Sequence, residues 1–220
     1  MKVKKILKII GIIIIVLIVL FLIHTFRNFI IISRIQDKVA KYQNSSNYHV
    51  HSVSYQDNMT IISDYYTKDN KEFMTLERKS ENDNTKLSFY NNGERIDMFV
   101  ENAEEKSVKI NAAKEIIPIT VVNVLQTDNK WQTFLYGSIS KIKTIEYEGK
   151  QCYAIDNYLS PYHLHTLDEK PKYIIEKETG LLLANKSNNN IVAEREYKFD
   201  NVQDSVFIEP DISQYKLLEN

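Results

Sequence analysis

The chain has 220 residues, with 28 Lys and Arg, 29 Asp and Glu, and one cysteine. Six of the basic residues and none of the acidic ones precede residue 35, so residues 35–220 carry 22 basic and 29 acidic groups, a net charge of −7. An acidic domain is a poor match for nucleic acid or for an anionic lipid surface, and a single cysteine excludes an internal disulfide.

The first element is an apolar run, Ile9–Phe26, that contains no charged side chain. Eighteen residues at a helical rise of about 1.5 Å span about 27 Å, close to the thickness of the hydrocarbon part of a bilayer. The run therefore predicts one transmembrane helix. Only Arg27 and Arg34 follow it before the charges balance, whereas four lysines precede it, so we expect a cytoplasmic N-terminus and an extracytoplasmic remainder. The four are Lys2, Lys4, Lys5 and Lys8.

A cleaved signal peptide is the alternative interpretation of this run. It requires a shorter apolar core and small residues at the cleavage site. The residues at 24–29, HTFRNF, are bulky at every candidate position, and no cysteine is present there for lipid attachment. We therefore predict an uncleaved anchor. The predicted segments are a cytoplasmic basic tail (1–8), a transmembrane helix (9–26), a juxtamembrane helix (27–46) and an extracytoplasmic β domain (47–220).

The juxtamembrane segment has an apolar stripe at helical spacing, formed by Ile32, Ile35, Val39 and Tyr42. The stripe predicts a helix over residues 28–43 that continues the anchor and packs on the domain. A coiled-coil partner helix is an alternative, but the stripe is short for one.

From Tyr48 onward the apolar period changes to two, which predicts an antiparallel meander. Asn92-Gly93 and Glu148-Gly149 are turn sequences that favour hairpins. We expect strands at 48–55, 60–67, 72–80, 86–90, 96–101, 107–111, 139–147, 151–157, 172–177, 181–185 and 191–199.

The middle of the chain interrupts this pattern with two predicted helices. Pro118 opens one over residues 119–126, and Asp128 is the expected N-cap of the second. In the second helix Trp131, Phe134 and Leu135 share a face. We expect both helices to cover one face of the sheet.

The last third of the chain has a recognisable pattern. Residues 173–183, YIIEKETGLLL, form a strand, a turn ending in Gly180, and a second apolar strand; the segments YKFDNV (197–202), DSVF (204–207) and PDI (210–212) follow. This pattern resembles the C-terminal part of LolA-like proteins, the superfamily of periplasmic lipoprotein carriers and their Gram-positive relatives. The resemblance implies a mainly β (α+β) fold, a curved antiparallel sheet or half-barrel with short helices on its concave face and an apolar cavity for acyl chains. It transfers no functional residue, and the predicted anchor distinguishes this chain from the soluble carriers.

Four of the five histidines form two His-x-His pairs, His49/His51 and His163/His165. Residues i and i+2 of a strand point to one face, so each pair can supply two imidazoles to Zn²⁺, as in a metal-dependent envelope enzyme. The alternative is packing as half-buried rings on a Tyr-rich sheet. We favour packing, because no spacing rule brings the two pairs together, and predict no metal or cofactor.

No catalytic residue is expected. Cys152 lies on a predicted strand without a nearby histidine or basic cluster, which indicates a buried, inert thiol. The sequence contains no G-x-S-x-G, S-x-x-K, P-loop or H-E-x-x-H motif, and the charged run Glu101–Lys106 is typical of a solvated turn. We expect a binding protein rather than an enzyme.

The chain contains 14 tyrosines and nine phenylalanines. They indicate either an aromatic groove for a lipid, glycan or peptide, or a twisted sheet with aromatic residues on both faces. The predicted function is a membrane-anchored binding protein of the bacterial cell envelope that holds a lipid, acyl chain or lipoprotein in an apolar cavity. The alternative is an envelope sensor or scaffold that binds another protein.

Overall fold

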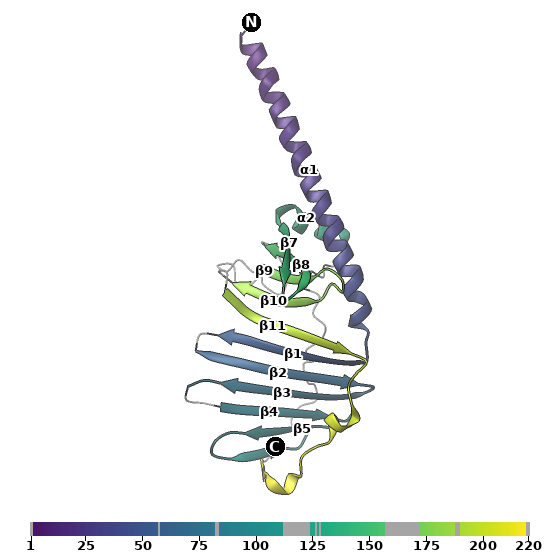
Figure 1. The fold of residues 1–220 in the computed structure, drawn as a ribbon, viewed down its shortest axis with the longest axis vertical. Helices are drawn as coiled ribbons and strands as arrows, with labels where there is room; N and C mark the ends of the chain where they lie inside the picture. Colours follow the sequence, from purple (N-terminus) through teal and green to yellow (C-terminus); the bar gives the residue numbers. More distant parts are fainter. Residues whose placement is uncertain are drawn as a thin grey trace. The chain divides into compact units, whose positions relative to one another are not determined.

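The computed structural model describes residues 2–56, 58–81, 84–111, 124–125, 127, 129–156, 172–187 and 190–218. The chain divides into two compact units. Unit 1 comprises Met1–Val39 and Asn123–Leu181, and unit 2 comprises Ala40–Val122 and Leu182–Asn220. The fold is mainly β, with antiparallel strands and a long N-terminal apolar helix, as predicted (Figure 1).

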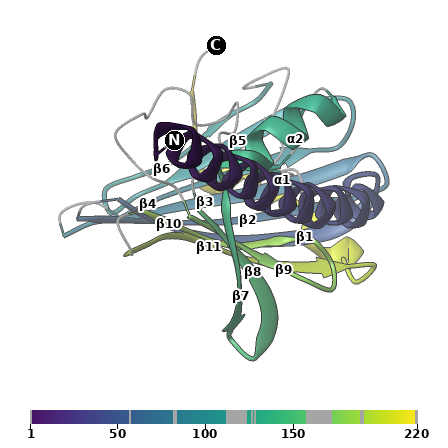
Figure 2. The same cartoon turned by 90° about the horizontal axis from the view of Figure 1, so that it is seen from above.

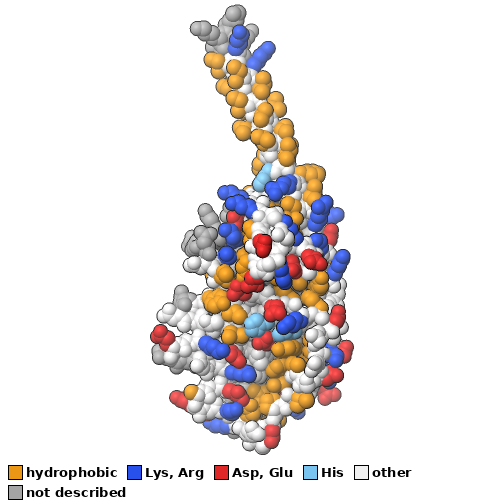
Figure 3. Space-filling view, viewed as in Figure 1, with side chains coloured by type: hydrophobic (Ala, Val, Ile, Leu, Met, Phe, Trp, Pro, Cys, Tyr) orange, Lys and Arg blue, Asp and Glu red, His pale blue; other side chains and the backbone are white. Residues whose placement is uncertain are grey.

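Helix α1 runs without a break over Lys2–Gln43. Within the described residues, Lys5–Gln43 is the one helix long and apolar enough to cross a membrane. Hydrophobic side chains cover its N-terminal part (Figure 3), and those from Ile9 to Ile23 are about half exposed or more. Residues 28–43 are helical, as predicted, and their apolar stripe is buried, because Ile32, Ile35 and Val39 are at most 2% exposed.

Unit 1 also contains helix α2 (Lys130–Ile139) and the strands β7 (Lys141–Tyr147), β8 (Lys150–Asp156) and β9 (Lys172–Glu176). These strands are ordered β9-β8-β7 and pair antiparallel. The predicted two-residue turn between β7 and β8 is confirmed, because Glu148 and Gly149 have φ angles of +49° and +76°.

In unit 2 the strands form an open, curved sheet in the order β12-β6-β5-β4-β3-β2-β1-β11-β10 (Figures 1 and 2). Neighbours pair antiparallel except β12, which pairs parallel with β6. Two short 3-10 helices, η2 (Asp204–Phe207) and η3 (Ile212–Gln214), precede β12. The strands are β1 (Asn47–Gln56), β2 (Met59–Lys68), β3 (Lys71–Lys79), β4 (Asn84–Asn91), β5 (Ile96–Glu101), β6 (Lys106–Lys109), β10 (Leu182–Ser187), β11 (Asn190–Phe199) and β12 (Lys216–Leu217).

All eleven predicted strands are present, and their bounds differ from the prediction by at most two residues at either end. The two-residue β12 was not predicted. The turn at Asn92-Gly93 is longer than expected, because Asn92 N donates to Arg95 O across it and only Gly93 has a positive φ. The Asn92 side chain stabilises this loop by accepting from Glu94 N and Arg95 N.

The two helices predicted in the middle of the chain have different outcomes. The predicted helix over 119–126 lies almost entirely outside the described residues. The N-cap of α2 is Asn129, whose Oδ1 accepts from Gln132 N at 2.9 Å, so the prediction of Asp128 was wrong by one residue. The predicted packing face of α2 was also wrong, because Trp131 is 65% exposed while Thr133 and Gly137 are buried.

Candidate functional site

A row of aromatic rings crosses one face of the sheet in unit 2. The strand register places His49 opposite Tyr66, Tyr66 opposite Phe73, and Phe73 opposite Tyr90. Ring centroids along the row are 4.1, 5.8, 4.4, 5.4 and 5.0 Å apart. The row consists of His49, Tyr66, Phe73, Tyr90, Phe99 and Tyr215.

The opposite face of this sheet is also aromatic and is more deeply buried. Tyr48 and Tyr65 are at most 6% exposed, and their ring centroids are 5.8 Å apart. Phe199 packs between the rings of Tyr48 and Tyr42, at 6.0 and 4.6 Å. The aromatic excess is therefore explained by a sheet with aromatic residues on both faces, which was one of the two interpretations.

The first His-x-His pair binds a carboxylate. His49 Nε2 and His51 Nδ1 lie 2.7 and 2.9 Å from the same oxygen, Asp64 Oδ1, and the His49 ring stacks on Tyr66 at an interplanar angle of 2°. Burial alone would raise the pKa of Asp64, but the hydrogen bonds from both histidines outweigh it and lower the pKa.

The structure does not test a joint site of all four histidines, because His163 and His165 lie outside the described residues. Among the residues that are described, no group of three or more His, Cys, Asp or Glu side chains is arranged to hold a metal ion.

A ladder of alternating charges lies beside the aromatic row. Glu77 follows Phe73 by four residues on β3 and therefore faces the same side. Lys86 lies directly between Glu77 and Glu101 on the neighbouring strands, and Lys106 lies opposite Glu101. Opposite charges at such cross-strand positions stabilise the pairing of the strands.

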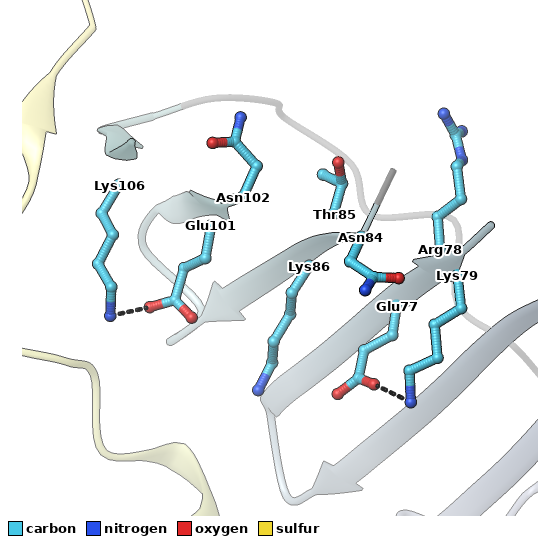
Figure 4. A pocket seen from close by; sticks show the side chains of 9 residues that line it. All are labelled: Glu77, Arg78, Lys79, Asn84, Thr85, Lys86, Glu101, Asn102 and Lys106. Carbon is cyan, nitrogen blue, oxygen red and sulfur yellow. Dashed lines mark hydrogen bonds and ion pairs between the residues drawn. The ribbon is translucent and has the colours of Figure 1, made fainter. Parts of the chain in front are cut away.

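This ladder forms the floor of an open groove with a volume of about 310 Å³ (Figure 4). Lys106 Nζ and Lys79 Nζ each make an ion pair of 3.1 Å, with Glu101 and Glu77 respectively. Figure 4 shows Lys86 between these two pairs. Six of the nine lining residues are ionisable, four of them cationic and two acidic. The lining residues are Glu77, Arg78, Lys79, Asn84, Thr85, Lys86, Glu101, Asn102 and Lys106.

The C-terminal segment closes one end of this face. Tyr215 Oη donates to Glu101 Oε1 at 2.5 Å, and its ring meets Phe99 edge-on at 5.0 Å. This hydrogen bond is the main cause of a lowered pKa at Glu101, and it raises the pKa of Tyr215 to about 12.

Ion pairs of Arg95 also hold the C-terminal segment in place. Arg95 Nε lies 2.8 Å from Asp97 Oδ2, and Arg95 also reaches Glu209 at 3.3 Å. Asp97 is fully buried, and its other oxygen accepts from Asn111 N at 3.1 Å. The position of the segment beside the groove is therefore set by charged and aromatic contacts together.

Sequence reasoning missed the groove. The prediction of a turn at Glu101–Lys106 holds for residues 102–105, but the flanking Glu101 and Lys106 are on strands and line the groove. The ladder depends on the register of four strands, which no single stretch of sequence reveals. The alternation of Glu and Lys at facing strand positions was the only local signal.

The prediction of a buried Cys152 is confirmed. The thiol is fully buried in unit 1. Burial, with the charge of Glu176 as a second cause, raises its pKa. A raised pKa disfavours the thiolate, which is the nucleophilic form.

These features define a mainly β protein with one N-terminal helix of membrane-spanning length. No protein-family model matches the chain, and no curated protein matches it in sequence. Among solved structures it is similar to a crystal structure of MucB, with 8% identity, a TM-score of 0.37, and coverage of 81% of this chain and 62% of that one. A crystal structure of MucB in complex with MucA(peri) gives 10% identity, a TM-score of 0.35, and coverage of 79% and 58%. The chain spans about three fifths of the length of these structures.

Proposed function

We propose that this chain is a membrane-anchored, extracytoplasmic binding protein, that it acts by binding rather than catalysis, and that its ligand is a segment of another envelope protein. The observation that carries the proposal is the charge ladder of Glu77, Lys86, Glu101 and Lys106 on the floor of an open groove. The sequence predicted this function as the alternative, an envelope sensor or scaffold that binds another protein. The groove is the contact surface that we now propose for it.

The chemistry of the groove favours a polypeptide over an acyl chain. An acyl chain seated on six ionisable side chains would remove water from them and supply no hydrogen bond in return, which is strongly unfavourable. A peptide supplies backbone N–H and C=O groups and charged side chains that can pair with both signs of the ladder. The amide of Asn84, which faces the same side of β4 as Lys86, lies at the groove for such contacts (Figure 4).

A lipoprotein is a second candidate, and the adjoining aromatic row favours it. The rings of Tyr66, Phe73 and Tyr90 are half-buried and run beside the polar groove. An acylated polypeptide would place its polar backbone on the ladder and its acyl chain along these rings. Binding of a free lipid in an apolar cavity, the first prediction from the sequence, has no counterpart in the groove that the described residues form.

The proposed topology places the lysines before the apolar run in the cytoplasm and both units outside. Four lysines precede the apolar run, whereas only Arg27 and Arg34 follow it closely. This excess of positive charge before the run supports the orientation. A reporter that is active only outside the membrane, fused after residue 220, tests it. Activity of the reporter agrees with the proposal, and an inactive reporter with a stable fusion contradicts it.

The function is tested by photo-crosslinking in intact cells that express the full chain with a benzophenone amino acid at Asn84, which is exposed and faces the same side of β4 as Lys86. The expected result is an adduct with one protein, identified by mass spectrometry. Lys86→Gln neutralises the middle of the ladder at similar size and should reduce this adduct, whereas Lys198→Gln, at an exposed position of β11, should leave it unchanged.

Two outcomes would contradict the proposal. One is an adduct that forms equally in the Lys86→Gln and Lys198→Gln variants, since it would not depend on the ladder. The other is an adduct with lipid alone, which would favour the original prediction of lipid binding. An adduct with a protein that carries an acyl chain would select the lipoprotein candidate.

A further inference from the structure

Helix α2 is held along α1 just beyond the apolar run, in the same compact unit (Figures 1 and 2). The contacts run in opposite directions along the two helices. Further from the predicted span, Gln36 Nε2 of α1 donates to Thr133 Oγ1 in the N-terminal half of α2 at 3.4 Å. Closer to the membrane span, a Cβ added at Gly137 would lie 3.4 Å from atoms of Phe29 and Ile32. The two helices are therefore antiparallel, and the C-terminal end of α2 points toward the span.

Polar contacts fix this C-terminal end. Asn28 Nδ2 donates to Gly137 O at 2.9 Å and to Ser140 O at 2.8 Å, and His24 Nε2 lies 3.2 Å from Ser140 O. Asn28 is fully buried. Because the predicted span ends at Phe26, Ser140 lies level with the end of the span.

The side of α2 away from its buried residues is an exposed apolar stripe. Trp131, Leu135 and Ile139 are 65%, 45% and 49% exposed. They follow one another at intervals of four residues and so share one side of the helix, away from the buried Thr133 and Gly137.

Aromatic and cationic groups accompany the stripe. A chain of rings leads from the end of the span to the stripe: Phe26 to Phe29 at 6.3 Å, Phe29 to Phe134 at 6.1 Å, and Phe134 to Trp131 at 5.6 Å. Exposed cations are close in the sequence: Lys141 and Lys143 follow Ile139 by two and four residues, and Arg27 precedes Asn28 on α1. Exposed apolar side chains with Trp and cations at one level of a membrane helix are typical of the membrane interface.

We propose that α2 is a second membrane contact, whose stripe of Trp131, Leu135 and Ile139 lies in the interface of the same bilayer that α1 spans. Ile139 is the deepest of the three, since it is next to Ser140. Trp131 lies at most about 12 Å further out, the rise of eight helical residues, and the headgroup layer is about 5–8 Å thick. Leu135, at most about 6 Å out, therefore lies among the headgroups, and Trp131 reaches their outer edge where α2 is tilted toward the membrane plane.

Such a contact would orient unit 1 on the membrane, because a single helix leaves rotation about its own axis free whereas a second contact to one side prevents it. The insertion is apolar and needs no anionic lipid, so it is compatible with the net negative charge of residues 35–220.

Trp131 is the only tryptophan of the chain, which makes its fluorescence a direct reporter. The full chain is reconstituted into phosphatidylcholine vesicles that contain a fraction of lipid brominated on the acyl chain, a short-range quencher. Two further single-tryptophan proteins are compared: Trp131→Phe with Ile139→Trp, and Trp131→Phe with Asp37→Trp. Asp37 is an exposed residue of α1 in unit 1, about 16 Å along the helix from Phe26, so it serves as the matched control.

The expected order of quenching by brominated lipid is position 139 first, position 131 second, and position 37 without measurable quenching, with a several-fold difference between 139 and 37. The order for quenching by aqueous iodide should be the reverse. Circular dichroism of each protein verifies the fold.

The proposal is overturned if positions 139 and 37 respond alike to brominated lipid. It is also overturned if position 139 is shielded from both quenchers, since a protein partner or a second copy would then cover the stripe. Dilution with lipid separates these two: shielding by a second copy is lost at low protein density, and shielding by a co-purified partner is not. None of these readings involves the groove of unit 2, so the test is independent of the proposed function.

Discussion

The side-chain amide of Asn28 donates a hydrogen bond of 2.9 Å to the carbonyl oxygen of Gly137, 109 residues further along the chain. The last carbonyls of a helix have no partner within the helix, and here Asn28 supplies one. A Cβ added at Gly137 would lie 3.4 Å from Phe29 N and Ile32 Cδ1, an ordinary van der Waals contact, so the two helices pack closely at this point. One polar residue, just beyond an apolar run, thereby defines where the second helix of unit 1 ends and how it faces.

Replacement of this amide should loosen α2 selectively. Asn28→Ala leaves the carbonyl oxygen of Gly137 without its donor and leaves Ser140 O with the contact to His24 alone. We expect a loss of about 1–3 kcal/mol of stability, the usual cost of an unsatisfied buried polar group. Thermal unfolding of the full chain in lipid nanodiscs measures it. The neighbouring Arg27→Ala, at an exposed position, is the control. Equal melting temperatures for Asn28→Ala and the parent would show that the hydrogen bonds contribute nothing.

Two glycines with similar backbone angles should differ in their tolerance of alanine. Gly149 and Gly180 have φ angles of +76° and +78°, so alanine is strained at both by about 1–2 kcal/mol. At Gly149 no atom lies within 4 Å of the added Cβ, whereas at Gly180 the carbonyl oxygen of Ile35 would lie at 2.8 Å. Gly180→Ala should therefore destabilise unit 1 clearly more than Gly149→Ala. Thermal melts that rank the two variants equally would contradict the packing of this turn against α1.

Local sequence patterns predicted the strands well because the determinants of a strand are local. Alternation of apolar residues and turn residues such as Glu148-Gly149 act within a few positions of one another. The stripe of Ile32, Ile35 and Val39 was predicted for the same reason, since a helix face is visible in one segment.

Contacts between segments that are distant in the sequence could not be predicted from local patterns. The apolar residues of α2 were assigned to a buried face because they are apolar, yet the small residues Thr133 and Gly137 are buried instead. Close helix packing selects for small volume at the contact, and the sequence does not show which helix is the partner. The charge ladder likewise depends on registers between strands, and Tyr215 joins it from 114 residues away.

Reversal of one charge in the ladder should weaken the pairing of β3, β4 and β5. Lys86→Glu places three carboxylates at directly opposed positions, Glu77, the new side chain and Glu101, and such like-charge pairs cost about 0.2–1 kcal/mol each. The melting temperature of the full chain should fall, and added salt should restore part of the loss because it screens exposed charges. Lys198→Glu, at an exposed position of β11, should change the melting temperature less. A loss that is insensitive to salt would contradict the electrostatic explanation.

The hydrogen bond between Tyr215 and Glu101 gives a prediction with a defined pH dependence. Tyr215→Phe removes the hydroxyl but keeps the ring against Phe99. Glu101 is partly exposed, so we expect a modest loss of about 0.5–1 kcal/mol at neutral pH. The folded-state pKa of Glu101 lies below its ordinary value, so the stabilisation is present above the ordinary pKa of a glutamate and is lost as the pH falls through the lowered value.

The difference between the parent and Tyr215→Phe should therefore be constant from pH 8 to about pH 5 and should shrink at more acidic pH, where the carboxyl is protonated in both proteins. Chemical unfolding of the full chain in nanodiscs across this range measures it, with Tyr55→Phe, whose hydroxyl reaches Glu194 at an exposed position, as the control. Because the pKa of Tyr215 is raised to about 12, the tyrosine itself stays protonated throughout and cannot produce the change. A difference that persists unchanged into strong acid would mean that Tyr215 stabilises the C-terminal segment through packing and not through Glu101.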